Sequence, residues 1–314
     1  MKLIVQPDEG LAPVLTAIKQ AKKSIDVLIF RLDRGELARA LEAAVARGVA
    51  VRALTAHTNR GGDKHLRRLE LQLLEGGVTV SRTAGDLVRY HGKMMIVDSR
   101  VLHVYGFNFT AIDLGKSRSF GVVMRNERLV EEAVKLFAAD FDRQPYSCGS
   151  KRLIVSPENA RERLAAFLNG ARRQLLIYDP ALTDDAMLRI LQANVREGVE
   201  VKIIGKVEAK WQLKFEKYPG RRLHVRAIVR DGNRAFIGSQ SLRKLELDKR
   251  REIGIIVTDR AVVQGMAAVF AQDWCETPSG KRAVKKGAKT VAKRSSTPRA
   301  GGGGEAARRS PPTL

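Results

Sequence analysis

The chain has 314 residues, of which 44% are hydrophobic, and it carries a formal net charge of +23. Its longest apolar runs, such as DVLIF and GIIV, are far shorter than the ~20 residues of a membrane-spanning helix, and its first ten residues lack the apolar stretch of a signal peptide. The two cysteines, Cys148 and Cys275, have no metal-ligand or redox spacing, so neither a disulfide framework nor a zinc site is expected. These features predict a globular, cytoplasmic protein.

Much of the positive charge lies at the C-terminal end. Residues 277–314 hold ten Lys or Arg against one Glu and few large apolar side chains, so we expect a disordered basic tail. Lys281, Lys285, Lys289 and Lys293 are four apart, the spacing of a basic helix that forms on an anionic surface. The rest of the chain keeps about +14. This excess favours nucleic acid, an anionic membrane surface or a phosphorylated substrate as partner, and a basic background without such a partner is the alternative.

The chain contains an internal repeat. LIVQPDE at 3–9 recurs as LIVSPEN at 153–159, and ARGVAVRAL from Ala46 recurs as REGVEVKII from Arg196, both at an offset of 150. Each copy has the pattern of a strand, an amphipathic helix, an apolar strand, a second helix and a further strand. This alternation predicts the α/β class, with a largely buried sheet in each half.

From His91 onward the offset changes to 133, so that His91 matches His224 and Asp98 matches Asp231. The change indicates an insertion in the first half before His91, which includes a predicted helix, KHLRRLELQLLEGG. The predicted organisation is a first half at 1–147, a second half at 148–276 and a tail at 277–314.

The segment HGKMMIVD, residues 91–98, places two polar side chains at the start of an otherwise apolar strand. Residues i and i+2 of a strand point to the same face, so His91 and Lys93 are expected to project together, and His224 and Arg226 likewise. Each of these strands is followed by a turn and a second apolar strand that ends in small or polar residues, YGFN or GSQS. An imidazole, a cation and amide or hydroxyl groups therefore converge in each half.

These segments resemble the phospholipase D superfamily, whose signature is HxKxxxxD, then six further residues, then GSxN. HGKMMIVDSRVLHVYGFN keeps the histidine, lysine, aspartate and asparagine, but Tyr105 and Gly106 stand at the usual glycine and serine. HVRAIVRDGNRAFIGSQS keeps the histidine, aspartate, Gly238 and Ser239, with arginine for lysine and Ser241 for asparagine. Two copies at matched spacing make the resemblance specific. It implies two pseudo-symmetric α/β/α sandwich halves packed around one active site.

Members of the superfamily usually place a glutamate 28 residues after each histidine to orient it. Glu252 stands at that spacing from His224, whereas Ser119 stands there after His91. The expectation is therefore that Glu252 supports His224 and that His91 lacks its carboxylate unless Asp113 substitutes.

The resemblance implies a metal-independent reaction through a phosphohistidine, with no cofactor. A neutral imidazole attacks a phosphodiester more easily than an anion does, and a second, protonated imidazole gives a proton to the leaving group. His91 is expected to be the nucleophile and His224 the acid, with Glu252 favouring the protonated form of His224. The expected ligands of the phosphate oxygens are Lys93, Asn108, Arg226, Ser239 and Ser241.

Three residues of the signature are expected to be structural: Asp98, Asp231 and Gly238. We expect the two aspartates to pair with basic groups across the interface between the halves. His57, His65 and His103 have no counterpart in the other half and are predicted to be solvated or structural.

The substrate is harder to predict, because the superfamily includes phospholipases, cardiolipin synthases and nucleases. Residues 206–218, KVEAKWQLKFEKY, would form a basic and aromatic stripe if helical, which suits a membrane surface or a nucleic acid, although an ordinary core stripe is the alternative. Low aromatic content, 5%, and two unequal halves in one chain favour a phospholipid. The expected protein is a monomeric phosphodiesterase or phosphatidyltransferase, peripheral to the inner membrane surface. A nuclease and a degenerate phosphate-binding member are the alternatives, the latter because of Ser119, Gly106 and Ser241.

Overall fold

The computed structural model describes residues 1–57 and 63–285. Strands of the first half are β1 (Lys2–Gln6), β2 (Ser24–Ile29), β3 (Ala50–Thr55), β4 (Thr79–Arg82), β5 (Arg89–Tyr90), β6 (Met94–Val97), β7 (Val101–Tyr105) and β8 (Ser117–Met124). Its helices are α1 (Ala12–Gln20), α2 (Gly35–Ala46), α3 (Asp63–Glu75), α4 (Ala111–Lys116) and α5 (Glu127–Phe141).

The second half repeats this plan without a counterpart of α3. Its strands are β9 (Leu153–Val155), β10 (Gln174–Leu182), β11 (Glu200–Val207), β12 (Phe215–Glu216), β13 (Arg222–Leu223), β14 (Arg226–Arg230), β15 (Arg234–Gly238), β16 (Arg250–Arg251) and β17 (Ile253–Val257). Its helices are α6 (Ala160–Asn169), α7 (Asp185–Arg196), η1 (Ala209–Trp211), α8 (Lys244–Asp248) and α9 (Arg260–Glu276).

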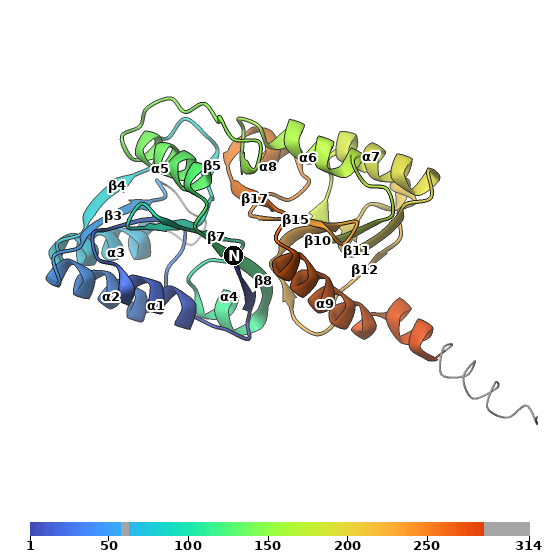
Figure 1. Cartoon of the computed structure of the whole chain (residues 1–314), viewed down its shortest axis with the longest axis horizontal. Helices are drawn as coiled ribbons and strands as arrows, with labels where there is room; N and C mark the ends of the chain where they lie inside the picture. The colour runs from blue at the N-terminus through green and yellow to red at the C-terminus, as the bar shows by residue number, and fades with distance from the viewer. Residues whose placement is uncertain (58–62, 286–314) are drawn as a thin grey trace, which may run out of the picture.

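The two sheets have the same strand order. It is β1-β8-β7-β6-β2-β3-β4 in the first half and β9-β17-β15-β14-β10-β11-β12 in the second. Helices lie on both sides of each sheet, with α1 and α2 opposite α5, and α6 and α7 opposite α9 (Figure 1). The predicted α/β fold with two related sandwiches is confirmed, as is the inserted helix, α3.

One buried cluster joins the halves. It contains Phe120 and Phe137 of the first half and Tyr178, Ile255 and Phe270 of the second, all at most 3% exposed. Each half has one further cluster of its own, under α1, α2 and α3 in the first half and under α6 and α7 in the second. Because the central cluster belongs to both sheets, the halves are held in one fixed relation.

Asp98 follows β6 directly, at the turn to β7, and Asp231 follows β14 directly, at the turn to β15. Asp98 accepts hydrogen bonds from the backbone amides of residues 22–24, and Asp231 accepts them from residues 172–174. Both residues have positive φ, 54° and 52°. The expectation that they pair with basic groups across the interface is wrong, because three consecutive amides of their own half already occupy each carboxylate.

Residues 206–218 do not form the helix on which the basic and aromatic stripe depended, and the alternative, aromatic side chains in the core with solvated lysines, agrees with the structure. The segment continues β11, makes the short turn η1 and pairs β12 in parallel with β11. Trp211 and Phe215 pack against the core of the second half, and the Tyr218 hydroxyl donates to Asp273. The aromatic side chains therefore serve the core, which leaves the lysines on the solvated side.

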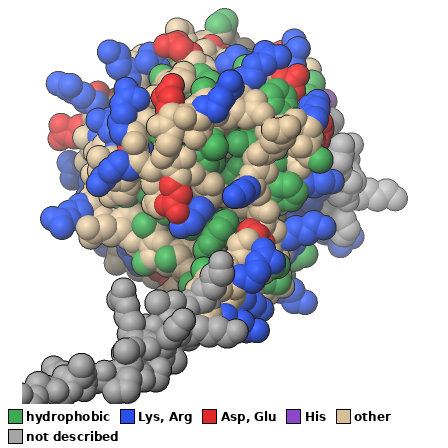
Figure 2. Space-filling view, turned by 90° about the vertical axis from the view of Figure 1, so that its right-hand side faces the viewer, with side chains coloured by type: hydrophobic (Ala, Val, Ile, Leu, Met, Phe, Trp, Pro, Cys, Tyr) green, Lys and Arg blue, Asp and Glu red, His purple; other side chains and the backbone are tan. Residues whose placement is uncertain are grey.

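Residues 278–285 are helical, where a disordered tail from 277 was expected, and residues 286–314, with Lys289 and Lys293, lie outside the described residues. His65 belongs to α3, but its side chain is likewise not described. None of the described helices is both long enough and apolar enough to span a bilayer. Lys and Arg side chains are spread widely over the face in Figure 2 and stand among fewer acidic ones.

Two ion pairs related by the repeat cross between the halves. Arg118 of β8 binds Asp273 of α9 through two bonds of 2.8 and 3.0 Å, and Arg251 of β16 binds Asp140 of α5 at 3.1 Å. All four side chains are buried. Asp273 also accepts the hydroxyls of Tyr178 and Tyr218, whereas Oδ2 of Asp140 has no partner among the described residues. Burial accordingly raises the pKa of Asp140 to about 6.

Replacing Asp273 with Ala should lower the free energy of unfolding by about 3–5 kcal/mol, because the Arg118 charge would be left buried without its partner. Asp140→Ala is the matched control, and it should cost less, since the Asp140 carboxylate is only partly compensated. Urea unfolding of both variants at neutral pH measures the difference. An equal or larger loss in Asp140→Ala would contradict the proposed ranking.

Candidate active site

The two histidine segments meet at a cavity of about 560 Å³ between the halves. Each segment is placed there by a short strand that pairs with the opposite half: β5 with β16, and β13 with β8. The His91 amide donates to the Arg251 carbonyl at 2.7 Å, and Gly92 leaves space for Ile253, whose Cδ1 would lie 2.6 Å from a Cβ at that position. The position of His91 is thus set by the second half.

His91 is paired with a carboxylate of the second half. Its Nδ1 lies 2.8 Å from Oε2 of Glu252, and the ring is only 7% exposed. Phe30 packs edge-on against the ring, with 4.5 Å between centroids. Lys93 Nζ lies 2.8 Å from Nε2 of His91, so the two side chains meet as expected, although His91 and Lys93 lie between β5 and β6 and not in the strand that was predicted from residue 91.

His224 is paired with a carboxylate of the first half. Its Nδ1 lies 3.4 Å from Oδ2 of Asp113, which also binds Arg222 and Asn108. The expectation that Glu252 supports His224 and that Asp113 substitutes at His91 is therefore wrong. The carboxylates are exchanged between the halves, because β5 and β13 each pair with a strand of the opposite half and carry the histidines toward its loops.

The pKa values of both histidines are lowered. For His91 the causes are burial, then the charges of Lys93 and Arg226, and for His224 they are burial, then Arg226. Burial also lowers the pKa of Lys93 to about 7. The pKa of Glu252 is raised by burial, against the opposing effect of Lys93. At neutral pH the imidazoles are therefore mainly neutral.

Buried polar atoms of several cavity-lining residues have no hydrogen-bond partner among the residues described. They include Nη1 of Arg226 and Oδ1 of Asn108, as well as Nδ1 of His224 and Nε of Arg31 and Arg250. Nε of Arg226 binds the Ser241 hydroxyl at 3.2 Å, and Nδ2 of Asn108 binds Asp113 at 2.7 Å. Both side chains are thus fixed by one end, and their other ends are available for a ligand beside the two histidines.

Several predicted site residues lie behind the cavity wall. The Ser239 hydroxyl bonds the backbone of Ile253, accepting from its amide at 3.1 Å and donating to its carbonyl at 3.2 Å. Ser241 holds Arg226 and donates its amide to Glu246. Lys93 and Glu252 contact His91. The phosphate-binding roles expected for the two serines do not match these contacts, since their hydroxyls are already engaged within the second half.

The structure brings further residues to the site that the sequence reading missed. Six arginines line the cavity: Arg226, which was predicted, and in addition Arg31, Arg89, Arg222, Arg243 and Arg250. The carboxylates of Asp33 and Glu246 join that of Asp113, which was considered above as a partner of His91. Arg89 and Arg222 each stand two residues before a histidine, and Asp113 matches Glu246 at the repeat offset of 133. Comparing the two copies outside the signature would have found these pairs.

Part of the cavity lining is apolar. It consists of Leu66 and Leu69 of α3 together with Phe30, Leu32 and Ile112. The insertion in the first half therefore contributes directly to the site. Among the described residues no cluster of three or more His, Cys, Asp or Glu side chains is arranged to hold a metal ion.

A family model described as "cardiolipin synthase, phospholipase D-like domain" matches residues 14–142 and 164–274, which cover both halves. The chain belongs to the phospholipase D superfamily. The match includes both histidine segments and their exchanged carboxylates, so it covers the whole site.

Relatives of the chain include proteins named for cardiolipin. It is 29% identical over 136 residues to mitochondrial cardiolipin hydrolase of Canis lupus familiaris, which covers 43% of this chain and 50% of that protein. It is 21% identical to cardiolipin synthase 1 of Bacillus cereus, over 91% of this chain and 69% of that protein. The chain spans about half the length of the first curated relatives it matches.

A solved structure of similar fold is polyphosphate kinase from Porphyromonas gingivalis. The TM-score is 0.72 at 19% identity, over 86% of this chain and 46% of that one. At this identity the similarity concerns the fold alone.

The exchange of carboxylates predicts that Glu252→Gln will perturb His91 and leave His224 unchanged. A carboxylate that accepts the Nδ1 proton fixes the tautomer of the ring, and an amide holds it more weakly. The ¹⁵N-coupled imidazole signals of histidine-labelled protein measure this directly. Asp113→Asn is the matched control and should perturb His224 instead. If Glu252→Gln altered the His224 signals and spared those of His91, the pairing described above would be wrong.

Proposed function

We propose that the chain is a phosphatidyltransferase or phosphodiesterase that acts on phospholipids through a phosphohistidine on His91. The observation that carries the proposal is the meeting of two buried histidines, one from each half, at a single arginine-lined cavity. The family match and the cardiolipin-named relatives support it.

In the proposed reaction, neutral His91 keeps its proton on Nδ1, from which it donates a hydrogen bond to Glu252, so that Nε2 carries the lone pair that attacks phosphorus. The phosphorus–nitrogen bond forms as the bond to the leaving alcohol breaks, and Nε2–H of His224 gives the leaving oxygen its proton. In the second step His224 takes a proton from the acceptor hydroxyl. That oxygen attacks phosphorus, and the bond to His91 breaks.

The cations around the histidines would hold the phosphate oxygens. Arg226 offers its unpaired Nη1, and Asn108 is fixed beside it by Asp113. Lys93 would move its ammonium from His91 Nε2 to a phosphate oxygen. A phosphate anion compensates these buried positive charges, so the same groups that bind the substrate stabilise the charge that develops in the transition state.

The walls of the cavity favour a phospholipid over a nucleic acid. Leu66, Leu69 and Ile112 provide an apolar surface for the non-phosphate part of the substrate. Among the described residues that line the cavity, Phe30 is the one aromatic side chain apart from the two histidines. It already packs against His91 and lies under Lys93. Nucleic-acid bases would therefore have no free aromatic ring on which to stack. Binding of the basic tail to an anionic membrane, a monomeric state and a location at the inner membrane surface stay predictions.

The proposal predicts release of headgroup from an anionic phospholipid in EDTA, and loss of turnover by at least ~10³-fold in His91→Ala. Vesicles of anionic lipid, vesicles of choline lipid and single- and double-stranded DNA are compared with wild type and variant. Cleavage of DNA alone, lost in the variant, would make the chain a nuclease. Inactivity on every substrate, with intact anion binding, would make it a binding protein.

A substrate with an activated leaving group separates the two histidines. Bis-p-nitrophenyl phosphate needs no proton on departure, so His224→Ala should release one nitrophenolate equivalent in a burst and then stop, while His91→Ala releases none. A burst in His91→Ala would exchange the two roles.

The proposal also predicts that kcat/KM falls as pH rises through about 7. Burial lowers the pKa of Lys93 to about 7, so the Lys93 ammonium of the free protein loses its charge as pH rises through that value, whereas His224, whose pKa is lowered well below its ordinary value, loses its proton at lower pH. A profile from about pH 5 to pH 9 measures this. Lys93→Arg keeps its charge and should extend activity to higher pH if Lys93 sets the limb. A kcat/KM that increases through pH 7 would contradict the assignment.

A further inference from the structure

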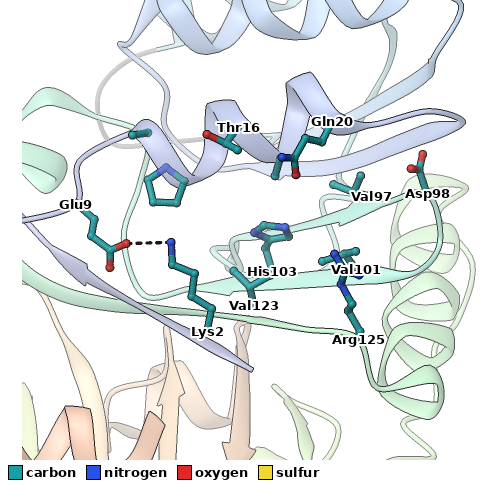
Figure 3. A pocket seen from close by; sticks show the side chains of 13 residues that line it. Lys2, Glu9, Thr16, Gln20, Val97, Asp98, Val101, His103, Val123 and Arg125 are labelled. Carbon is teal, nitrogen blue, oxygen red and sulfur yellow. Dashed lines mark ion pairs between the residues drawn. The ribbon is translucent and has the colours of Figure 1, made fainter. Parts of the chain in front are cut away.

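A second cavity, of about 590 Å³, lies between α1 and the sheet of the first half. Its floor is formed by Val97, Val101, His103 and Val123, and α1 covers it (Figure 3). It reaches the turn that follows Asp98, at the opposite end of β6 from His91. It has no lining residue in common with the catalytic cavity. We call it the α1 slot.

His103 is the polar group inside the α1 slot. Its side chain stands on the side of the sheet that faces α1, below Thr16 and Gln20 (Figure 3). The residue is 3% exposed, Nδ1 is buried, and no described residue gives the ring a hydrogen bond. Burial alone lowers its pKa to about 4, so the imidazole is neutral at physiological pH. A buried polar atom without a partner destabilises the free protein and favours a ligand that supplies one.

In the second half, the space that corresponds to the α1 slot is filled by side chains of the core. At the repeat offsets, Ala17 corresponds to Phe167 and His103 to Phe236. Phe167 is 4% exposed and Phe236 1% exposed, both within the core beneath α6 and α7. The space between helix and sheet is therefore of a size that aromatic rings fill. Ala17 leaves that space open in the first half.

A third difference between the two copies, at Val97, also leaves the α1 slot open. Val97 corresponds to Arg230, whose guanidinium stacks on Phe167 with 4.9 Å to the ring centroid and donates to the Phe167 carbonyl at 2.9 Å. In the second half this side chain extends over Gly170, where a Cβ would lie 2.2 Å from Nη1. The first half has Gln20 at that position, which is exposed at the mouth of the slot.

The charges along the slot are mostly compensated within the protein. Lys2 pairs with Glu9 at 3.3 Å, and the Asp98 carboxylate is occupied by backbone amides. Arg125 is exposed to solvent at the mouth. The interior thus offers aliphatic contacts and one neutral imidazole, and it has no uncompensated charge that would select an ion.

We propose that the α1 slot binds a small, uncharged heteroaromatic molecule whose ring takes the place of the Phe167 ring and whose polar edge hydrogen-bonds His103. The inference does not depend on the catalytic function. Nucleobases and indoles share this chemistry, with a flat ring face and a hydrogen-bonding edge.

Indole is the test probe, and indene, which has the same shape without the N–H, is its matched control. Full-length protein carrying ¹³C-labelled histidine is titrated with each compound, and the ring signals are assigned with His103→Phe. Indole should bind with a dissociation constant of about 1 mM or below and shift the His103 signal. His103→Phe should weaken indole about tenfold, as expected for one hydrogen bond, and leave indene unchanged.

Ala17→Phe restores the ring found in the second half and should abolish the binding of both compounds. Circular dichroism verifies that each variant is folded, and the two variants test the slot by different routes. Absence of any His103 shift up to the solubility limit of indole would overturn the proposal. Shifts confined to His91 and His224 would place indole in the catalytic cavity and overturn it equally. Tighter binding of decanoate than of indole, lost in Ala17→Phe, would replace the aromatic ligand with an acyl chain.

Discussion

The site depends on the exchange of short strands between the two halves. β5 pairs with β16 and β13 pairs with β8, so the residues directly before each histidine are held by a strand of the opposite half. The same exchange brings Arg118 to Asp273 and Arg251 to Asp140. Neither half can assemble a histidine with its carboxylate alone. Folding of the shared core and formation of the site are therefore a single event, which is why the halves cannot move apart without dismantling the cavity.

The cost of the arrangement is electrostatic. Burial of Lys93 among arginines lowers its pKa to about 7, and the same environment keeps both histidines mainly neutral. In the free protein this concentration of positive charge is only partly offset by Glu252, Asp113 and Glu246. In the proposed reaction, a bound phosphate diester would supply the missing negative charge and raise the proton affinity of the histidine that is proposed to act as acid. Binding and proton placement are thus linked through one set of charges.

The sequence predicted the repeat, the sheets and the apolar strands that follow both histidines, because each has a local signature in the spacing of apolar and polar residues. Partners across the interface had no such signature. Glu252 lies 161 residues from His91, and its spacing from His224 suggested the wrong partner. Ser239 was assigned to phosphate, yet its hydroxyl is used by the Ile253 backbone. Such assignments depend on three-dimensional proximity, which spacing along one strand does not encode.

A duplicated chain offers its own control, because equivalent positions have the same backbone surroundings. Where the copies agree, as in Asp98 and Asp231 or the arginine before each histidine, the residue serves a geometry that both halves need. Where they differ, the equivalent residues have different contacts. Glu252 pairs with a histidine and Ser119 does not, and Phe236 lies in the core of the second half whereas His103 lines the α1 slot. The asymmetry in the cavity between the halves and the opening beneath α1 are thus both differences between equivalent positions of the two copies. In each case one copy carries a side chain whose contacts the equivalent residue of the other copy does not make.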